Sequence, residues 1–396
     1  MSEWKKVKLG ELCDFINGGA WSDKEYVSDG IPVLKVTNCK NSGFSISELS
    51  YLPYSLKQKY SQNELRLHDV IIATVGSHPN LVNSSAGRSV IVNSFVTGFY
   101  LNQNAVCIRT KKANILNQLY FGYYSKYYLF QNYIQMRGKG AANQMRIAIS
   151  SIKDYPMPLP PIEHQAYIAT ILSRYDSLIE NYQKQIKLLE EAAQRLYKEW
   201  FVDLHFPGHE TTKIIDGVPE GWEKKKVGDM ISKIQRTKQV TTNNYQASGK
   251  IPVIDQSRNY IAGYTDDAEC LVKVTVPYIV FGDHTRILKY IPFSFAKGAD
   301  GTQLIMSNDL ERMPQTLFYN SLIEIDLSNY SYARHFKYLK EEFVLLPSEY
   351  IARKYDSIVS RYYQSIQKSR EQIRLLTEAR DRLLPKLMNG ELNVYL

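Results

Sequence analysis

Asp283 and His284 stand next to each other in the stretch FGDHTR, residues 281–286. A carboxylate beside an imidazole could move a proton or hold a metal ion. A tight zinc site needs three or four such ligands, and nothing in the spacing of His78 or His335 brings either one to this pair. The sequence therefore predicts no metal site.

Motifs that handle phosphates or methyl groups are missing as well. The sequence contains no G-x-x-x-x-G-K-[ST] phosphate loop and no G-x-G-x-x-G turn. It has no paired acidic-lysine nuclease signature and no Pro-Pro-Tyr or Pro-Pro-Phe motif of the amino-methyltransferases. The Gly-rich stretch GADGTQ (298–303) does not precede a convincing helix. We expect a chain with no catalytic residues and no cofactor of its own.

Several loops carry the residue types that contact DNA. Arg and Lys suit phosphates and guanine, and Asn, Gln, Ser and His suit base edges or phosphates, particularly beside glycines. Any surface loop is polar, however, so composition alone leaves an ordinary solvated surface open. The candidates for DNA contact are Ser77, Asn80, Asn83, Arg88, Arg137, Lys139, Asn143, Gln144, Arg146, Gln256, Arg258, Asn259, His284, Arg286, Tyr332, Arg334, His335 and Lys337.

The elements that must position these loops form two strand-rich globules. Short β-branched runs bounded by Gly, Asn, Pro or Ser predict strands in both parts of the chain, such as IPVLKVTN and DVIIATVG in the first and IPVIDQ in the second. The Tyr-rich stretch 116–135 predicts one helix. Each globule ends shortly before a Leu-Pro step, at residues 159–160 and 346–347.

A repeat follows each Leu-Pro step. A shift of 187 residues, without a gap, places Ser173-Arg174-Tyr175 on Ser360-Arg361-Tyr362. A weaker echo lies upstream, where Ile31-Pro32-Val33 matches Ile251-Pro252-Val253. Because periodic similarity marks duplicated structural units, the chain is expected to run globule, helix, globule, helix.

Both helices carry an apolar stripe whose steps alternate between four and three residues. A sustained heptad stripe requires a partner helix. A single core helix is the plainer alternative, but about 39 residues at 1.5 Å each span roughly 58 Å, too long for one compact domain. We predict that the two helices pair antiparallel. Ser369 and Arg380 interrupt the second stripe, and Pro385 should kink or end that helix. The predicted packing residues are Ile168, Leu172, Tyr175, Ile179, Tyr182, Ile186, Leu189, Leu196, Val359, Tyr362, Ile366, Ile373, Leu376 and Leu383.

The predicted organisation is an α+β protein with a pseudo-two-fold repeat. Its parts are a first domain at 1–158, a first helix at 159–206, a second domain at 207–347, and a second helix with a tail at 348–396. Residues 1–158 carry 18 Lys and Arg against 10 Asp and Glu, whereas 207–347 carry 17 of each. Excess positive charge attracts polyanions. Four scattered cysteines and no apolar run near 20 residues predict a cytoplasmic protein without a membrane anchor.

The chain resembles the specificity subunit of type I restriction-modification systems over essentially its full length. The most specific part is LPPIEHQAYIATILSRYDSLIENYQKQIKLLEEAAQRLYKEWF (159–201) with its C-terminal twin. FGDHTR, FAKGADGTQLI (295–305) and YARHFKYL (332–339) resemble one type of target-recognition domain in that family. GKGAANQMRIAISSIKDYPMPLPP (138–161) resembles the end of a first such domain.

The resemblance implies two target-recognition domains that each read one half of a bipartite double-stranded DNA target. It implies that the coiled coil sets the gap between the halves, and that two methyltransferase subunits and the endonuclease–translocase subunits dock on the chain. S-adenosylmethionine, ATP and Mg²⁺ would belong to those partners.

The second copy departs from the family pattern at one point. It lacks the Pro-Ile-Glu-x-Gln run that follows the first Leu-Pro and reads Pro347-Ser348-Glu349-Tyr350 instead. A structural alternative also stays open: a coiled-coil adaptor between two proteins, without sequence-specific DNA binding.

Overall fold

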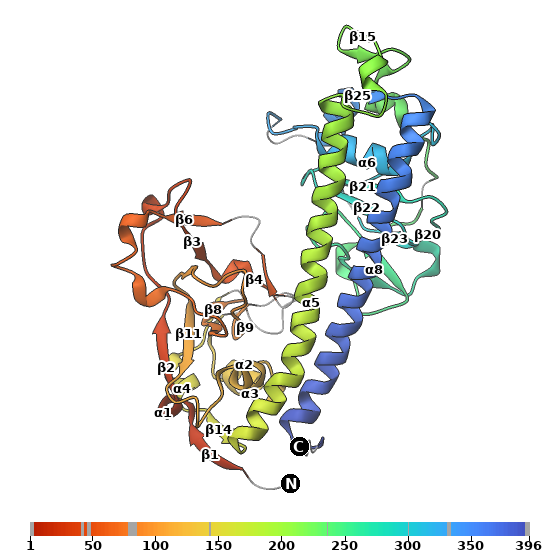
Figure 1. Ribbon diagram of the computed structural model, residues 1–396. Coiled ribbons are helices and arrows are strands. Elements are labelled where there is room, and N and C mark those ends of the chain that lie inside the picture. The colour runs from red at the N-terminus through yellow and green to blue at the C-terminus, as the bar shows by residue number, and fades with distance from the viewer. Residues whose placement is uncertain are drawn as a thin grey trace. The chain divides into compact units, whose positions relative to one another are not determined.

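A computed structural model describes residues 4–40, 43–45, 49–77, 85–141, 144–235, 237–299, 301–330 and 334–392 (Figure 1). The chain forms two compact units. Unit 1 comprises Met1–Glu180 with Arg374–Leu396, and unit 2 comprises Asn181–Ile373. Two long helices, α5 (Ile162–Tyr197) and α8 (Glu349–Met388), therefore contribute a segment to each unit. Helices and strands are mixed in both units, which confirms the α+β class.

Unit 1 is built on small, mostly antiparallel sheets. Its central sheet has the strand order β2-β11-β7-β9, and all of its pairings are antiparallel. The remaining sheets have the orders β10-β3-β6, β12-β13-β8, β1-β14 and β4-β5. The strands are β1 (Lys5–Lys8), β2 (Cys13–Asn17), β3 (Ile31–Leu34), β4 (Cys39–Lys40), β5 (Gly43–Phe44), β6 (Ser50–Leu52), β7 (Val70–Ala73), β8 (Val75–Gly76), β9 (Ser89–Ile91), β10 (Tyr100–Leu101), β11 (Ala105–Thr110), β12 (Lys139–Ala141), β13 (Gln144–Arg146) and β14 (Pro156–Leu159).

The helices of unit 1 correct one prediction. The stretch 116–135 is two helices, α2 (Gln118–Tyr124) and α3 (Tyr128–Gln135), rather than one. Ser125 ends the first helix, because its hydroxyl donates to the Gly122 carbonyl and its own carbonyl accepts from the Gln131 side chain. Two short helices, α1 (Leu9–Leu12) and α4 (Ile149–Lys153), complete the unit.

Unit 2 repeats this plan with different lengths. One sheet has the order β19-β18-β23-β20, a second has β22-β21-β24, and two-stranded pairs are β17-β25 and β15-β16. The strands are β15 (Ile214–Ile215), β16 (Val218–Pro219), β17 (Glu223–Lys226), β18 (Ile251–Ile254), β19 (Gly263–Thr265), β20 (Leu271–Val272), β21 (Tyr278–Gly282), β22 (Leu288–Ile291), β23 (Phe295–Lys297), β24 (Thr302–Ile305) and β25 (Phe343–Leu346), and the helices are α6 (Gln315–Ile323) and α7 (His335–Glu341).

The faint upstream echo in the sequence corresponds to a real structural repeat. Ile31-Pro32-Val33 lies in β3, which has the antiparallel neighbour β6 on one side and the parallel neighbour β10 on the other. Ile251-Pro252-Val253 lies in β18, which has the antiparallel neighbour β19 and the parallel neighbour β23. The two tripeptides therefore occupy the same position in equivalent sheets.

A glutamine at the start of one helix holds each unit together in the same way. In unit 1, the Gln118 side chain accepts from the Thr110 N–H at 2.7 Å and donates to the His68 and Ile108 carbonyls. In unit 2, Gln315 accepts from the Ser307 N–H at 2.8 Å and donates to the Pro277 and Ile305 carbonyls. Each glutamine thus ties two neighbouring strands of a sheet to a helix.

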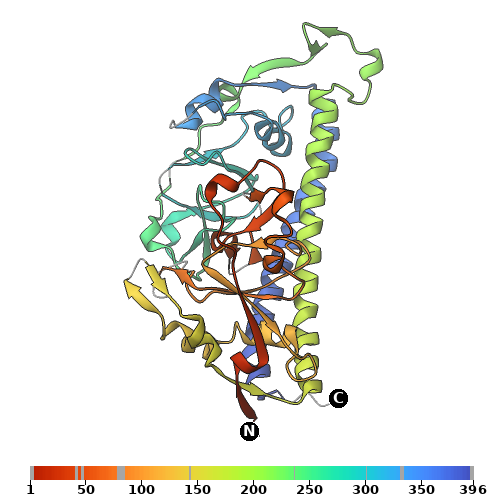
Figure 2. The same ribbon diagram turned by 90° about the vertical axis from the view of Figure 1, so that its left-hand side faces the viewer.

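The long helices pack antiparallel within each unit. In unit 2, Gln185 contacts Ser369 and the Ala193 carbonyl accepts from Tyr355, so the residue numbers run in opposite directions on the two helices. In unit 1, Asp176 pairs with Arg380. Figure 2 shows α5 as one uninterrupted helix. Helix α8 continues through Pro385 and ends at Met388, so Pro385 does not end the helix at its own position, and the alternative of a kink there stays a prediction.

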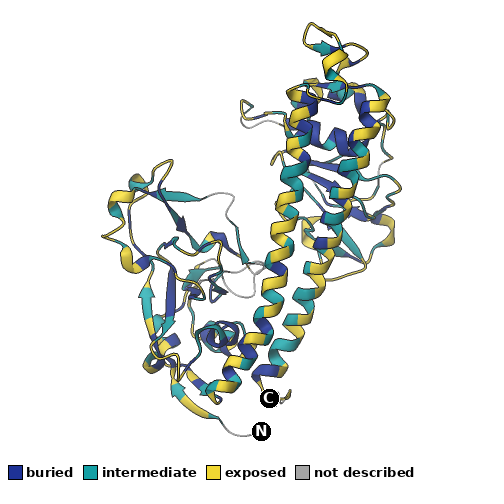
Figure 3. Cartoon of the chain, viewed as in Figure 1, coloured by how far each residue is buried: buried dark blue, intermediate teal, exposed yellow. Residues whose placement is uncertain are grey.

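The residues predicted to pack in the coil are all buried or half-buried, and Figure 3 shows such residues recurring along both helices. The two interruptions of the second stripe are matched by polar partners. Ser369 is buried, and its hydroxyl donates to the Gln185 side chain at 3.3 Å. Arg380 forms its ion pair with Asp176. The stripe is therefore interrupted only where a polar group on α5 faces the interruption.

In each unit, a hydrogen bond at an equivalent position joins a short helix to a long helix, but the two bonds are made by different residues. Tyr123 in α2 donates to Asp176 in α5 at 2.7 Å. Tyr363 in α8, which the 187-residue shift places on Asp176, donates to Asn320 in α6 at 3.1 Å. Tyr123 and Asn320 each lie five residues after the glutamine of their unit. The tyrosine lies in the short helix in unit 1 and in the long helix in unit 2, but both units have a hydrogen bond at this position.

The second copy lacks the glutamine of the Pro-Ile-Glu-x-Gln run, and another residue makes its hydrogen bond to the helix start. In unit 1, the buried Gln165 donates to the Pro160 carbonyl at the start of α5. Ala352 stands at the equivalent position of α8. There, Arg312 donates to the Pro347 carbonyl at 2.9 Å from outside the helix. Both helix starts are therefore tied to their unit through the carbonyl of an equivalent proline.

The glutamine of unit 2 generates a stability prediction. Gln315→Leu leaves the Ser307 N–H and the Pro277 carbonyl without their partner, and each buried unsatisfied group costs about 1–3 kcal/mol. We expect the free energy of opening in β21 and β24 to fall by about 2 kcal/mol, so that amide hydrogen exchange there accelerates roughly 30-fold.

The exposed Gln372→Leu on α8 is the matched control and should leave exchange in β21 and β24 unchanged. Equal protection in Gln315→Leu and wild type would show that this side chain does not hold the sheet.

Candidate nucleic-acid interface

The structure brings two of the candidate loops of unit 1 together in one small sheet. Met145 and Arg146 of β13 pair with Gly76 and Val75 of β8, so the hairpin at 139–146 lies beside the chain that leads into Ser77. Lys139, Gln144 and Arg146 are exposed. Asn80, Asn83 and Asn143 lie outside the described residues.

The hairpin places two positive charges face to face. Lys139 in β12 is the direct cross-strand partner of Arg146 in β13. Like charges at such positions destabilise a strand pair in the absence of an anion. The next residue of β12, Gly140, must be a glycine, because its φ is +133° and a Cβ there would lie 2.3 Å from the Gln144 carbonyl oxygen. A phosphate near this pair would relieve the repulsion.

Two further arginines of unit 1 have defined positions. Arg137 is exposed, with its guanidinium 3.5 Å from the centre of the Tyr133 ring and a hydrogen bond to the Tyr133 carbonyl. Arg88 is half-buried and donates to the Cys39 carbonyl at 2.6 Å, and burial lowers the pKa of its guanidinium. Arg137 is thus presented to solvent, whereas Arg88 braces the loop that contains it.

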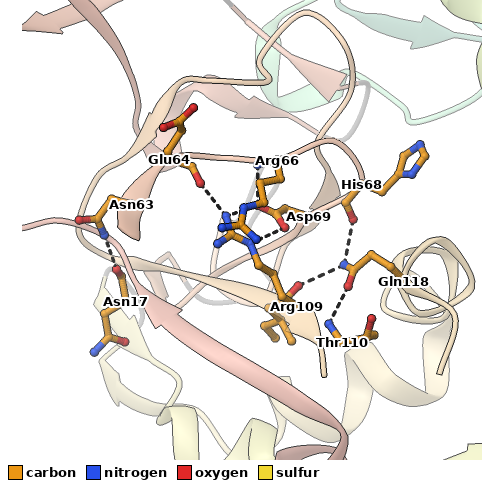
Figure 4. Close-up of polar contacts among 10 residues, drawn as sticks. Asn17, Asn63, Glu64, Arg66, His68, Asp69, Arg109, Thr110 and Gln118 are labelled. Atoms are coloured by element: carbon orange, nitrogen blue, oxygen red, sulfur yellow. Dashed lines mark hydrogen bonds and ion pairs between the residues drawn. The ribbon is translucent and has the colours of Figure 1, made fainter. Parts of the chain in front are cut away.

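A polar network at β11 and the start of β7 holds the strand that leads through β8 to Ser77 (Figure 4). Arg109 in β11 donates to both carboxylate oxygens of Asp69, at 2.8 and 2.6 Å, and to the Glu64 carbonyl. Asp69 stands directly before β7 and also accepts from the Arg66 N–H at 2.7 Å. Burial lowers the pKa of Arg109, but the Asp69 hydrogen bond and charge outweigh it, so the net shift is upward. Sequence reasoning missed this pair, because its members stand 40 residues apart without a motif.

Three candidate stretches of unit 2 also converge. The Gln256 side chain accepts from the His284 N–H at 3.1 Å, and its carbonyl accepts from the Thr285 hydroxyl at 2.7 Å. Asp283 donates its N–H to the Gly301 carbonyl at 2.7 Å. A Cβ at Gly301, whose φ is +73°, would lie within 2.6–2.8 Å of the Gln256 side chain. The loop after β18, the β21–β22 turn and the loop before β24 therefore meet at one place.

Helix α7 is attached to the same turn through Asp283. The buried Asp283 accepts from the Phe336 N–H at 2.8 Å, and its carbonyl accepts from the backbone and ring of His335. The other ring nitrogen of His335 contacts the Tyr330 carbonyl at 2.8 Å. His335 is buried, so its position suits a brace for α7 better than the DNA contact predicted for it.

The other candidates of unit 2 are exposed. Arg286 has a φ of +61°, and its guanidinium also donates to the Leu327 carbonyl, which holds it near the domain. Tyr332 lies outside the described residues. The exposed candidates are Arg258, Asn259, His284, Arg286, Arg334 and Lys337.

Asp283 and His284, the first pair considered in the sequence, make separate contacts. Asp283 is engaged with α7, while His284 points from an exposed turn. Across the described parts of the chain, no group of three His, Cys, Asp or Glu residues is arranged to hold a metal ion. All four cysteines are buried, and burial raises the pKa of Cys13 and Cys39 to about 12. Within those same parts, no helix has the length and apolar character that a bilayer crossing requires.

Comparisons with known proteins agree on one family. A family model for the type I restriction modification DNA specificity domain matches residues 1–191. The type I restriction enzyme MjaIX specificity subunit of Methanocaldococcus jannaschii is 28% identical over 273 residues, which are 62% of this chain and 62% of the relative. The putative MjaX specificity subunit of the same organism is 25% identical over 57% of this chain and 52% of the relative.

The chain is similar to the specificity subunits of type I restriction-modification systems, and the family model covers 191 of its 396 residues. The matched stretches span roughly half to three-fifths of these curated relatives. The crystal structure of the S subunit from M. genitalium aligns with 97% of this chain and 96% of its own, with a TM-score of 0.56 and 17% identity, which is a likeness of fold.

In unit 2, a buried lysine holds the loop that follows β18. Lys289 in β22 donates to the Asp255 carbonyl at 2.8 Å and to the Asn259 carbonyl. Its side chain is 4% exposed, and the Asp255 carboxylate is 3.9 Å away. Burial lowers the pKa of Lys289 to about 8, and the charge of Asp255 only partly opposes that shift. The base of a candidate DNA-contacting loop thus depends on a titratable group.

This pKa generates a pH prediction. Between about pH 8 and the ordinary lysine value of 10.5, the unfolded chain binds more protons at Lys289 than the folded chain does. The contribution of Lys289 to stability should therefore rise with pH over that window. We expect the free energy of unfolding of wild type, relative to Lys289→Met, to increase by about 2 kcal/mol from pH 8 to pH 10. Urea unfolding of both proteins measures it, and a difference that stays flat or falls with pH would contradict the assignment.

Proposed function

We propose that the chain is the sequence-specific DNA-binding subunit of a type I restriction-modification complex, and that each unit reads one half of a bipartite target. The observation that supports this most is the repeated framework with different loops. Gln118 and Gln315 make the same three kinds of contact, while the exposed polar residues of the candidate loops differ between the units. Base-edge contacts decide sequence preference, whereas the scaffold only holds them in register. Two copies of one scaffold with different loops suit two different half-sites.

The electrostatics of the two recognition domains suggest different modes of binding. Residues 1–158 have the excess of Lys and Arg, and Lys139 faces Arg146 in an exposed hairpin. Phosphate contacts by such groups supply sequence-independent affinity that falls with salt. Residues 207–347 are neutral in total, so unit 2 would depend on the local placement of exposed cations in its loops, such as Arg258, Arg334 and Lys337.

The long helices would set the gap between the half-sites. Both α5 and α8 contribute a segment to each unit. The polar residues Ser369 and Arg380 of α8 pair with Gln185 and Asp176 of α5. We further propose that the chain is non-catalytic and cytoplasmic. Two methyltransferase subunits and the endonuclease–translocase subunits would dock on it and contribute S-adenosylmethionine, ATP and Mg²⁺ chemistry.

Methylation-site sequencing of host DNA tests this function directly. Deleting the gene for this chain should abolish methylation at one bipartite motif with two half-sites and a constant gap, because the partner methyltransferase would lose its target reader. Complementation with the gene should restore the same motif.

A motif that persists unchanged after deletion would exclude the proposed role. A coiled-coil adaptor, the main alternative, would bind cognate and random duplexes equally at physiological salt.

Two arginines provide a matched pair for assigning the half-sites. Arg334 lies at the start of α7 in unit 2, and Arg146 lies in the hairpin of unit 1, and both are exposed. Removing one base-contacting arginine costs about 1–3 kcal/mol and relaxes preference at its own position. Arg334→Ala should therefore reduce discrimination at one half-site roughly tenfold. Arg146→Ala should affect the other half-site.

Competition binding against duplexes mutated at each base pair measures both variants. Equal loss at the two half-sites in either variant would show that the loops are assigned wrongly.

A further inference from the structure

The loop between β18 and β19 carries three of the DNA candidates. Gln256, Arg258 and Asn259 lie within it, and Arg258 and Asn259 are exposed. The Lys289 side chain donates hydrogen bonds to the Asp255 and Asn259 carbonyls in the first half of the loop. Its return is closed by a hydrogen bond from the Ala262 N–H to the Val253 carbonyl. The backbone of the loop is therefore held at both ends, and the middle is presented outward.

Tyr260 holds the second half of this loop. It directly follows the exposed Asn259, and its hydroxyl donates to the Tyr290 carbonyl at 2.7 Å. Phe293 packs edge-on against its ring with the centres 6.0 Å apart. On a loop with two exposed neighbours, an aromatic ring fixed in this way determines where those neighbours can point.

The other contact of that ring comes from the coil. The guanidinium carbon of Arg370 in α8 lies 3.8 Å from the centre of the Tyr260 ring. Arg370 also forms an ion pair of 3.0 Å with Glu190 in α5. A planar guanidinium can stack on a ring and bond a carboxylate at the same time, which a lysine ammonium cannot do equally well. Helix α8 thus contacts the loop through Arg370, and α5 contacts Arg370 through Glu190.

The same residues border a crevice of about 300 Å³ that reaches the candidate Arg258. Glu190, Arg258, Tyr260, Lys289 and Arg370 all line it. The side chains of Arg370 and Glu190 are 27% and 43% exposed, so as an isolated surface ion pair they would add little to stability. Stabilisation of the coil is therefore a small part of what this arrangement can do.

The repeat does not supply this arrangement twice. The 187-residue shift relates Arg370 to Gln183 and Glu190 to Thr377, which cannot form an ion pair. The two helix copies are otherwise alike at many of their packing positions. The difference falls where the coil meets a loop whose sequence is particular to unit 2.

We propose that Glu190 and Arg370 are positioning residues for the DNA-reading loop of unit 2, so that the coil helps to set base preference at one half-site in addition to spacing the two. This rests on the proposed function. Arg370 orients the Tyr260 ring, Glu190 orients Arg370, and the ring determines the position of Arg258 and Asn259. DNA contact itself is made by the loop residues, with neither coil residue touching a base.

The test uses the full-length chain and the bipartite motif returned by methylation sequencing. Competition binding against duplexes changed at each base pair gives the discrimination at each half-site for wild type, Glu190→Gln, Arg370→Gln and Arg370→Lys. A base pair in a specific site typically contributes roughly 5- to 150-fold discrimination. We expect Glu190→Gln and Arg370→Gln to lose about tenfold at the half-site that Arg334→Ala affects, and to keep wild-type discrimination at the other half-site. Arg370→Lys keeps the charge but loses the planar stack, so it should lose part of the discrimination.

Glu191→Gln is the matched control, because Glu191 is the next residue on α5 and pairs with Lys187 within the same helix. It should bind as wild type does. Thermal unfolding and affinity for non-specific DNA should be alike in all variants, which a purely structural role would not predict. If Arg370→Gln does not fold, Glu190→Gln carries the test alone.

Wild-type discrimination at both half-sites in Glu190→Gln and Arg370→Gln would overturn the inference. So would equal losses at both half-sites together with a lowered unfolding temperature, since that marks a weakened coil. A wild-type chain without any sequence preference would instead refute the proposed function.

Discussion

Two long helices in water are stable only if their apolar stripes are covered along their length, and this constraint organises the whole chain. In each unit, a segment of α5, a segment of α8 and one strand-rich fold share a single core. Ile168 and Leu172 of α5 lie in one core with Leu387 of α8, and Tyr355 and Val359 of α8 lie in the other with Ala193 of α5. The helices are therefore part of the domains as well as a connection between them. This explains why the compact units divide both helices and do not follow the helix ends.

The repeat has preserved positions more strictly than residues. Tyr123 with Asp176 and Tyr363 with Asn320 make the equivalent bond with the tyrosine on opposite sides. Gln165 and Arg312 reach the carbonyl of equivalent prolines from different elements. Such exchanges keep a buried polar group satisfied, which matters more than which residue does so. A framework that accepts these exchanges can hold its geometry while its exposed loops change.

The sequence predicted the parts of the structure that follow a one-dimensional rule. Heptad spacing selected residues on the two long helices that are buried or half-buried, and the gapless shift predicted the second long helix, α8. The Ile-Pro-Val echo identified equivalent strands, because β3 and β18 need the same residue types for the same two neighbours.

Features that depend on tertiary contacts could not be predicted from the sequence. Nothing local distinguishes Gln118 and Gln315 from exposed glutamines, because one carbonyl that each of them bonds lies far along the chain, at His68 and Pro277 respectively. The break at Ser125 depends on a side chain of the next helix. His335 looks like a surface residue among basic neighbours, but the Asp283 and Tyr330 carbonyls draw its ring inward. The pair Glu190–Arg370 resembles an ordinary coil ion pair until Tyr260 is seen beside it.

We propose that one chain reads two separate DNA segments through two units. Hydroxyl-radical footprinting of the full-length chain on a duplex that carries its methylation motif tests this most directly. The account predicts two protected blocks, one over each half-site, separated by an accessible gap, and loss of a single block when one half-site is scrambled. One continuous block, or two blocks that disappear together when either half-site is scrambled, would contradict it.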